Sequence, residues 1–290
     1  MKLHVITGLP RSGSTLLCNL LNQNPDVFAS STSPIPSLLN VMTHSWSSSA
    51  EVRAGLIRDS HWQEERLRTA ARGFIEGYYQ DRGKEIVFDK SRGWSNNLLT
   101  LWELYQNAKV IVTIRDLRNL FASVEKQHRK TALFDEAQDI KAKTIYARAD
   151  TQFSAQGLIG GPLEGIQDII NRGLDKRVFW LPLEDFSQSP SHSLSQLYKY
   201  LDLPGFQHDL LNVENTAEDV DAAYLLKYPH QGSGKVIPSD PSEWERYMSK
   251  DLADLIVGRF AWYYHRFYPS VVAKPSEAPV SKRVKGTTTI

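Results

Sequence analysis

The sequence predicts an α/β fold in which a central parallel sheet lies between two layers of helices. Three short runs rich in apolar and β-branched residues indicate buried strands, at residues 3–7, 85–89 and 109–114. A segment whose apolar residues recur at helical spacing follows each run. Strands that alternate with helices form parallel sheets covered by helices, so a three-layer α/β sandwich is the fold that we expect.

The elements expected in the amino-terminal part are a strand at residues 3–7, a loop at 8–13 and a helix at 14–22 that ends before Pro25. Residues 29–49 contain eight serines and two prolines but no Asp, Glu, Lys or Arg. Such a composition favours a loop, with one short helix at residues 38–42. Residues 51–82 carry charges on a helical period, which predicts one or two helices.

The elements expected next are helices at residues 98–105, 117–128 and 193–201 and a strand at 178–183. Residues 135–172 should be largely helical, with an interruption at Gly160-Gly161-Pro162. A single amphipathic helix is expected over residues 244–268. We therefore expect one domain over residues 1–272 and a loose tail over 273–290.

The composition argues against several classes of partner. The 34 Lys and Arg residues nearly balance the 33 Asp and Glu residues, so no global positive field favours nucleic acid. No apolar run approaches the roughly 20 residues of a membrane span, and the first residues are unlike a signal peptide. The single cysteine, Cys18, cannot form an intramolecular disulfide, which favours a reducing compartment. We expect a cytoplasmic protein that binds neither nucleic acid nor membrane.

The first motif is Gly-Leu-Pro-Arg-Ser-Gly-Ser-Thr at residues 8–15, between the first strand and the first helix. Its glycine spacing matches the phosphate loop G-x-x-x-x-G-K-[ST] of nucleotide-binding proteins, so the sheet is expected to be of the P-loop type. Backbone N–H groups and the positive end of a helix point at an anion in this geometry. The structural alternative is a plain strand-to-helix turn in which Ser14 caps the helix.

Ser14 stands where the phosphate loop carries its lysine. That lysine reaches the β- and γ-phosphates of a nucleoside triphosphate, so its replacement makes this loop a poor triphosphate site. The loop still offers backbone amides, two hydroxyls and Arg11 to a smaller anion. A guanidinium binds phosphate or sulfate with two parallel hydrogen bonds.

The second motif is Ile-Arg-Asp-Leu-Arg at residues 114–118, followed by Ser123. Arg115 comes directly after the strongest predicted strand, and ligands of open α/β sheets bind at the carboxyl ends of the strands. Ser123 lies eight residues later, just over two helical turns on, so both side chains can reach a second phosphate. The structural alternative is an ion pair of Arg115 with Asp116 at the start of a helix.

Together these residues resemble the sulfotransferases that use 3′-phosphoadenosine 5′-phosphosulfate (PAPS). Residues 10–15 resemble the loop that binds the 5′-phosphosulfate, and Arg115 with Ser123 resembles the motif that binds the 3′-phosphate. Residues 178–204 resemble the late strand and helix of that family. The tyrosylprotein branch is the most similar in motif, since it shares Pro-Arg-Ser-Gly and a sequence near Asn-Pro-Asp-Val.

The resemblance implies a role for each matching residue. The residues implied for the 5′-phosphosulfate are Arg11, Ser12, Gly13, Ser14 and Thr15, and those for the 3′-phosphate are Arg115 and Ser123. Lys90 matches a lysine that stabilises charge on the bridging oxygen as the sulfuryl group leaves. We expect Lys90 and Ser14 to carry the chemistry. Lys235, in Gly-Ser-Gly-Lys, matches more loosely a late loop that closes over the nucleotide.

Three positions depart from the family pattern. Ser31 stands where the tyrosylprotein branch has its catalytic glutamate, and Arg92 where the cytosolic small-molecule branch has its catalytic histidine. Leu183 stands where a tyrosine contacts adenine in the tyrosylprotein branch. The general base is therefore open, and the candidates are His44, His61, Asp89 and His128, each of which can equally be a solvated or structural group.

The resemblance implies PAPS as the co-substrate and requires no metal ion, since no His, Cys or carboxylate residues have metal-ligand spacing. The acceptor, a hydroxyl of a small molecule, sugar or peptide, or an amine, and the oligomeric state are open. Two alternatives stay in view: a phosphate-loop nucleoside or nucleotide kinase, and a non-catalytic protein that only binds nucleotide.

Overall fold

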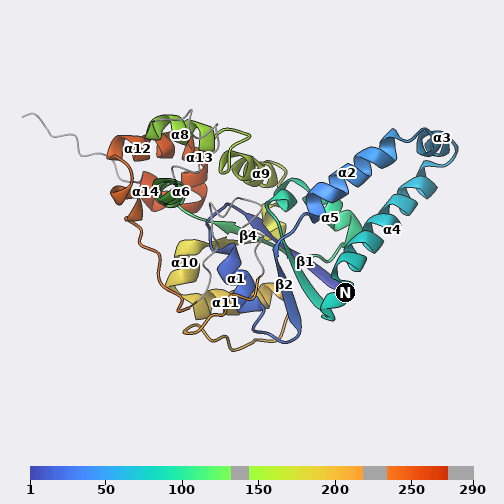
Figure 1. Cartoon of the computed structure of the whole chain (residues 1–290), viewed down its shortest axis with the longest axis horizontal. Helices are drawn as coiled ribbons and strands as arrows, with labels where there is room; N and C mark the ends of the chain where they lie inside the picture. The colour runs from blue at the N-terminus through green and yellow to red at the C-terminus, as the bar shows by residue number, and fades with distance from the viewer. Residues whose placement is uncertain (132–143, 218–233, 274–290) are drawn as a thin grey trace, which may run out of the picture.

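The computed structural model describes residues 1–131, 144–217 and 234–273. Its centre is a five-stranded sheet in which every pair of neighbouring strands is parallel, in the order β2-β3-β1-β4-β5. The strands are β1 (Lys2–Gly8), β2 (Val27–Thr32), β3 (Ile86–Lys90), β4 (Val110–Ile114) and β5 (Val178–Pro182). The predicted α/β fold is confirmed (Figure 1).

Both faces of the sheet are buried, and successive residues of each strand alternate between two hydrophobic cores. Val5 and Val87 belong to the first core, whereas Ile6 and Phe88 belong to the second. The helices that contribute to the first core include α4 (Ser60–Tyr79), α5 (Leu98–Leu104), α6 (Leu117–Thr131), α8 (Ile145–Gln152) and α9 (Gly160–Asn171). Those of the second are α1 (Ser14–Leu21), α10 (Leu183–Gln188) and α11 (Pro190–Leu201).

Three helices form an arm that extends away from the sheet: α2 (Ile35–Ser48), α3 (Ala50–Arg58) and α4 (Figure 1). The sequence predicted a short helix at residues 38–42, which lies within α2, but the loop predicted for the rest of residues 29–49 was wrong. The segment instead contains strand β2 and the 14-residue helix α2. Proline stands in the first turn of α2, where it is tolerated, and Ile35 and Leu39 are buried at helical spacing. Four of the eight serines that suggested a loop lie on this helix, and all four are exposed.

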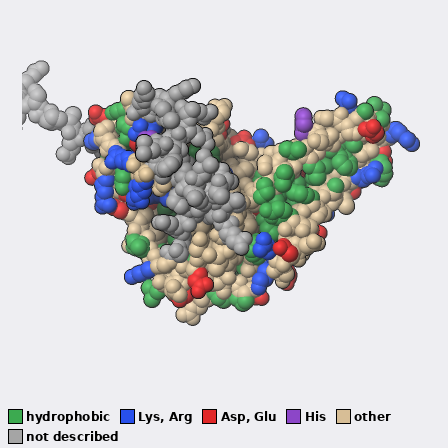
Figure 2. Space-filling view, viewed as in Figure 1, with side chains coloured by type: hydrophobic (Ala, Val, Ile, Leu, Met, Phe, Trp, Pro, Cys, Tyr) green, Lys and Arg blue, Asp and Glu red, His purple; other side chains and the backbone are tan. Residues whose placement is uncertain are grey.

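The outward face of α2 carries apolar side chains as well as serines. Leu38 and Val41 are exposed there, and Figure 2 shows hydrophobic side chains gathered along the arm. Among the described residues, no helix is both long and apolar enough to cross a membrane.

Two further helix predictions need correction. Gly160 begins α9 and does not interrupt a helix, since the break falls at residues 153–159. Glycine is needed at the start of α9 because a Cβ on Gly160 would lie 1.9 Å from the carbonyl of Ser154. The single helix expected at 244–268 is divided, because Ser249 caps a new helix start and Phe260 leaves the helical conformation. The pieces are a short 3-10 turn (Glu243–Arg246), α12 (Lys250–Arg259), α13 (Ala261–Phe267) and α14 (Pro269–Val272). The predicted tail falls almost wholly outside the described residues.

Candidate active site

A cavity of about 260 Å³ lies at the carboxyl ends of the strands, where the chain crosses from one side of β1 to the other. This is where open α/β sheets bind their ligands. The cavity is lined by residues 6–11 and 13–16 of the first strand, loop and helix, with contributions from Thr32, Lys90, Ser91, Arg92, Thr113, Arg115, Leu158 and Leu183. Both sequence motifs therefore meet at one site.

The loop between β1 and α1 has a backbone that few residues other than glycine adopt. Gly8 has φ +119°, and a Cβ there would lie 2.1 Å from the carbonyl oxygen of Thr113. Gly13, at the N-cap of α1, has φ +83°, and Arg11 takes a left-handed φ of +56° without being glycine. This strained path brings the first turn of α1, whose N–H groups have no acceptor within the helix, to the cavity wall.

Ser12 holds the loop in place instead of lining the cavity. Its hydroxyl contacts the carbonyl oxygen of Leu9 and donates to Thr113 Oγ1 at 2.7 Å, and only 1% of the residue is exposed. Thr113 Oγ1 donates in turn to the carbonyl of Thr7. Ser12 thus ties the loop to β4, while Gly13, Ser14 and Thr15 face the cavity.

Lys90 brings an ammonium group to the loop from the neighbouring strand. It is the last residue of β3, it is 6% exposed, and its Nζ donates to Thr15 Oγ1 at 3.0 Å. Its backbone is fixed by Ser30 Oγ and by the N–H of Ser33. A triphosphate loop carries a lysine at the position of Ser14. In this chain Lys90 supplies the cation from strand β3 instead.

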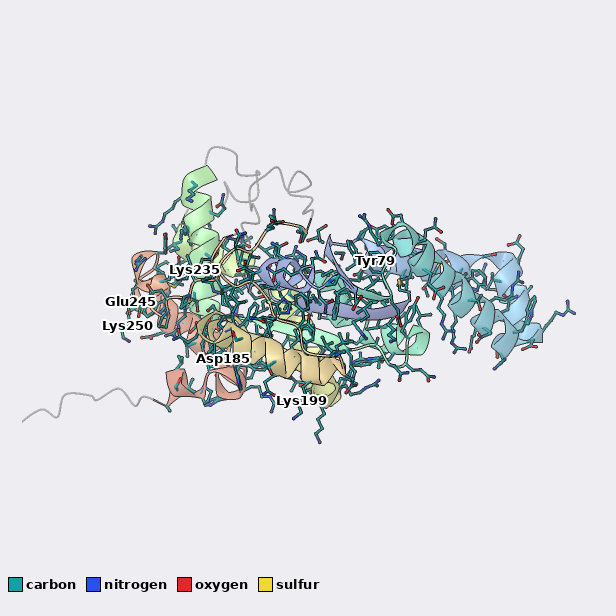
Figure 3. The ribbon with its side chains drawn as sticks, turned by 90° about the horizontal axis from the view of Figure 1, so that it is seen from below. Tyr79, Asp185, Lys199, Lys235, Glu245 and Lys250 are labelled. Carbon is teal, nitrogen blue, oxygen red and sulfur yellow. The ribbon has the colours of Figure 1, made fainter. Side chains whose placement is uncertain are left out.

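Asp89 points to the opposite face of the sheet from Lys90. It is fully buried and accepts hydrogen bonds from the Tyr79 hydroxyl and from Trp94 Nε1, the latter at 2.5 Å. Burial raises the pKa of this carboxyl, and its hydrogen bonds act in the other direction. Asp89 joins β3 to the base of the arm, and Figure 3 shows Tyr79 on that side of the molecule.

None of the four general-base candidates lines the cavity. Asp89 lies on the opposite face of the sheet. His44 and His61 are exposed on the arm, and His128 is half-buried on α6. Arg92, at one of the two positions where relatives carry a base, does line the cavity, whereas Ser31 at the other does not.

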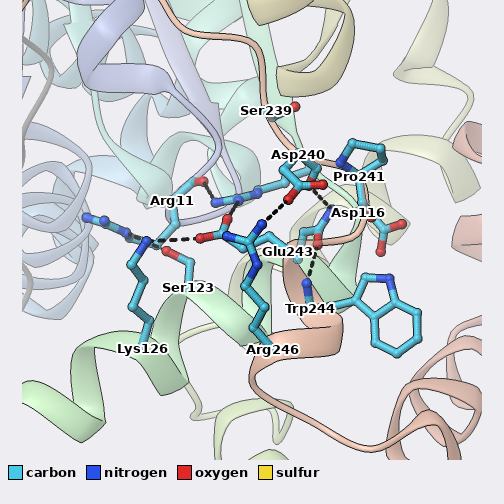
Figure 4. Close-up of polar contacts among 12 residues, drawn as sticks. Arg11, Asp116, Ser123, Lys126, Ser239, Asp240, Pro241, Glu243, Trp244 and Arg246 are labelled. Atoms are coloured by element: carbon cyan, nitrogen blue, oxygen red, sulfur yellow. Dashed lines mark hydrogen bonds and ion pairs between the residues drawn. The ribbon is translucent and has the colours of Figure 1, made fainter.

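A second cluster of cations forms around Arg115, directly after β4 (Figure 4). Arg115 is 7% exposed, and its Nη1 donates to the carbonyl of Arg11 at 3.0 Å. Arg11 Nε donates to Ser123 Oγ at 3.3 Å, so the two motifs are joined by direct contacts. No sequence motif pointed to Glu243, whose carboxylate contacts Arg115 Nη2 at 3.2 Å and Lys126 Nζ at 3.0 Å.

The end of β4 is fixed by aromatic hydroxyls from α13. Tyr263 donates to the carbonyl of Arg115 at 2.9 Å, and Tyr264 donates to Asp116 Oδ1 at 3.0 Å. Burial raises the pKa of both tyrosines well above the usual range, so both stay neutral donors. Asp116 pairs with Arg118 and not with Arg115, which leaves the Arg115 guanidinium to the cluster.

Lys235 is not among the residues that line the cavity. It is exposed, and its neighbour Gly234 pairs with Val213 away from the cavity. Gly232 and Ser233 of the same motif lie outside the described residues. Within the described ranges, no three His, Cys, Asp or Glu side chains gather closely enough to hold a metal ion.

The geometry therefore has two cationic clusters on one cavity, one around Lys90 and one around Arg115. A model of the sulfotransferase family matches residues 5–208, more than half of the chain. The chain belongs to the sulfotransferase family. The resemblance drawn from the two motifs is confirmed at the level of the family.

Solved sulfotransferases share the fold at low sequence identity. The sulfotransferase domain of the curacin biosynthetic pathway is 17% identical, with a TM-score of 0.52 over 90% of this chain and 97% of its own. A sulfotransferase from Alicyclobacillus acidocaldarius is 14% identical, with a TM-score of 0.51 over 95% and 98%. A mouse sulfotransferase complexed with PAP is 10% identical, with a TM-score of 0.50 over 93% and 86%. No curated protein sequence matches the chain.

Proposed function

We propose that this sulfotransferase transfers a sulfuryl group from PAPS to a hydroxyl or amine acceptor. The observation that carries the proposal is the pair of cationic clusters on one cavity, since PAPS carries a phosphosulfate at one end and a phosphate at its 3′ position. PAP is the donor without its sulfuryl group. That a mouse sulfotransferase of this fold was solved in complex with PAP supports PAPS as the donor.

At the first cluster, the amides of residues 13–15 and the hydroxyls of Ser14 and Thr15 bind the 5′-phosphosulfate. Ser12 serves this site through its ties to Leu9 and Thr113, which fix the loop. Lys90 lies on Thr15 and donates to the oxygen that bridges sulfur and phosphorus. That sulfur–oxygen bond breaks as the acceptor's oxygen or nitrogen bonds to sulfur, and the acceptor's proton passes to a base or to water.

The work of these residues is positioning and charge stabilisation, as in phosphoryl transfer. Negative charge grows on the leaving phosphate, where the loop amides and Lys90 are already oriented. One such preorganised donor contributes about 3 kcal/mol to the lowering of the barrier. At the second cluster, Arg115 and Ser123 bind the 3′-phosphate and fix the donor's orientation. Arg11, which the sequence assigned to the phosphosulfate, joins them in this proposal because its Nε donates to Ser123.

Calorimetric titration tests the donor assignment. The chain is titrated with 3′-phosphoadenosine 5′-phosphate (PAP) and with ATP plus Mg²⁺. Arg115→Ala is compared with a control, Arg172→Ala, at an exposed arginine directly after α9. We expect PAP to bind much more tightly than Mg²⁺–ATP. Arg115→Ala should weaken PAP by about 30-fold or more, because a buried charge-assisted contact is lost, and Arg172→Ala should not. Tight Mg²⁺–ATP binding without preference for a 3′-phosphate would favour the kinase.

A further inference from the structure

The carboxylate of Glu243 lies within the second cationic cluster. Its two oxygens contact Arg115 Nη2 and Lys126 Nζ, and only 18% of its side chain is exposed. Figure 4 shows Glu243 with its contact to Lys126. Arg115 is itself linked to Arg11, which contacts Ser123. The carboxylate therefore occupies the anion position that the cluster creates.

The backbone around Glu243 is held by contacts that do not involve its side chain. Asn119 donates to the carbonyls of Asp240 and Pro241, at 3.3 and 3.1 Å, and accepts from the N–H of Trp244 at 3.0 Å. Further back, the N–H of Ser239 donates to Ser187 Oγ at 3.0 Å. The carboxylate can consequently leave the cluster by side-chain rotation while the segment stays in place.

A buried arginine needs a counter-anion, and Glu243 supplies one. The pairing is incomplete, because within the described residues the buried Nε of Arg115 has no hydrogen-bond partner. A phosphate and a carboxylate on the same guanidinium repel each other, so both cannot be held there as anions at low cost. The two anions must exchange.

We infer that Glu243 is a specificity-determining residue that competes with the 3′-phosphate of the nucleotide for Arg115 and Lys126. The inference rests on the proposed donor site. Binding of PAPS or release of PAP then swaps one anion for another at the cluster. The exchange lowers the affinity for any nucleotide with a 3′-phosphate, and the returning carboxylate assists departure of the bisphosphate product. A nucleotide with a 3′-hydroxyl leaves Glu243 where it is.

The test compares Glu243→Gln with Glu245→Gln in calorimetric titrations with PAP and with adenosine 5′-phosphate, which lacks only the 3′-phosphate. Glu245 is exposed on the same 3-10 turn, so its variant removes the same charge two residues further along the chain. We expect Glu243→Gln to bind PAP about tenfold more tightly, the effect of about 1.4 kcal/mol, and adenosine 5′-phosphate within about twofold of the unaltered chain. Glu245→Gln should leave both affinities unchanged.

An unchanged or weaker affinity of Glu243→Gln for PAP, with adenosine 5′-phosphate binding intact, overturns the inference and makes Glu243 a structural partner of Arg115. The Arg115→Ala variant separates this result from failure of the proposed function. If Arg115→Ala leaves PAP binding unchanged, the 3′-phosphate site itself is misassigned. If it abolishes the preference for PAP while Glu243→Gln has no effect, only the competition is wrong.

Discussion

The two ends of the sheet differ in the charges that they bring together. At the amino end, Lys2 pairs with Glu85 and Lys109 pairs with Asp202, so each cation has its carboxylate nearby. At the carboxyl end, four cationic side chains line one cavity, and no Asp or Glu is among the described residues that line it. The lining of the cavity is therefore positive where a parallel sheet presents its ligand site, and Glu243, which pairs with Arg115, is not part of that lining.

The two ends also differ in how closely other backbone atoms approach their glycines. Gly8 and Arg11 both take positive φ beside the cavity, and Gly8 has the carbonyl of Thr113 where its Cβ would be. At the amino end, Gly83 also has a positive φ, but nothing lies within 4 Å of its Cβ position. Close backbone packing and a lining with four cations thus occur together at the carboxyl end of the sheet.

Substituting each of these two glycines by alanine should give the largest difference between the two ends, in the free energy of unfolding. Gly8→Ala forces a Cβ onto backbone atoms that cannot rotate away, so we expect a loss of about 4 kcal/mol in the free energy of unfolding. Gly83→Ala meets only the cost of a left-handed alanine, about 1 kcal/mol. Urea denaturation measures both, and equal losses would mean that close approach of β1 and β4 does not require Gly8.

The lysines of the two ends should differ in their effect on catalysis. Lys90→Met removes the ammonium beside Thr15, so we expect the rate of sulfuryl transfer to fall about 100-fold, with PAP affinity changed by less than about threefold. Lys109→Met, at the amino end, should change neither quantity appreciably. Transfer is followed as release of PAP from PAPS with the best acceptor from a panel of alcohols, phenols and amines.

If PAP affinity falls as steeply as the rate in Lys90→Met, Lys90 binds the nucleotide in the ground state and does not act selectively on the leaving group. If the unaltered chain itself gives no transfer with any acceptor while it binds PAP, the non-catalytic alternative takes precedence.

The sequence was most informative where local chemistry determines structure. The β-branched run at residues 109–114 and the glycine spacing at 8–15 predicted β4 and the first loop, because each pattern has few other uses. β2 was missed because it is an edge strand with half-exposed positions, and Val-Phe-Ala-Ser-Ser-Thr carries few large apolar residues. The serines of α2 concealed its buried stripe in the same way.

Sequence patterns did not predict the contacts between distant segments. Glu243 lies 128 positions from Arg115, and no local pattern relates the two. The serines of the first loop looked equivalent as anion ligands, yet the hydroxyl of Ser12 is used for Thr113 and Leu9. Asp89 looked like a candidate base, but strand alternation turns it away from Lys90 and toward Tyr79. Each error concerns the direction of a side chain, which spacing alone does not fix.

His4, at the amino end of the sheet, provides the last test of this comparison. Its imidazole could carry a positive charge, but its surroundings keep it neutral. The ring is buried, and its Nδ1 accepts from the N–H of Lys109 at 3.1 Å. Burial, assisted by Lys109 and Lys2, lowers the pKa of His4 to about 4 from 6.5. The unfolded chain therefore takes up the proton first, so this group contributes stability above pH 6.5 that is lost as the pH falls to about 4.

The loss should amount to about 2 to 3 kcal/mol, and a chain without this imidazole escapes it. We expect His4→Asn to be the less stable chain at pH 7, with a deficit that shrinks by that amount between pH 7 and pH 4 in urea denaturation. His61→Asn, at an exposed position of the arm, should give a curve parallel to that of the unaltered chain. Parallel curves for His4→Asn as well would mean that the amino end accepts the proton without loss of stability, and that exclusion of an added charge does not distinguish the two ends.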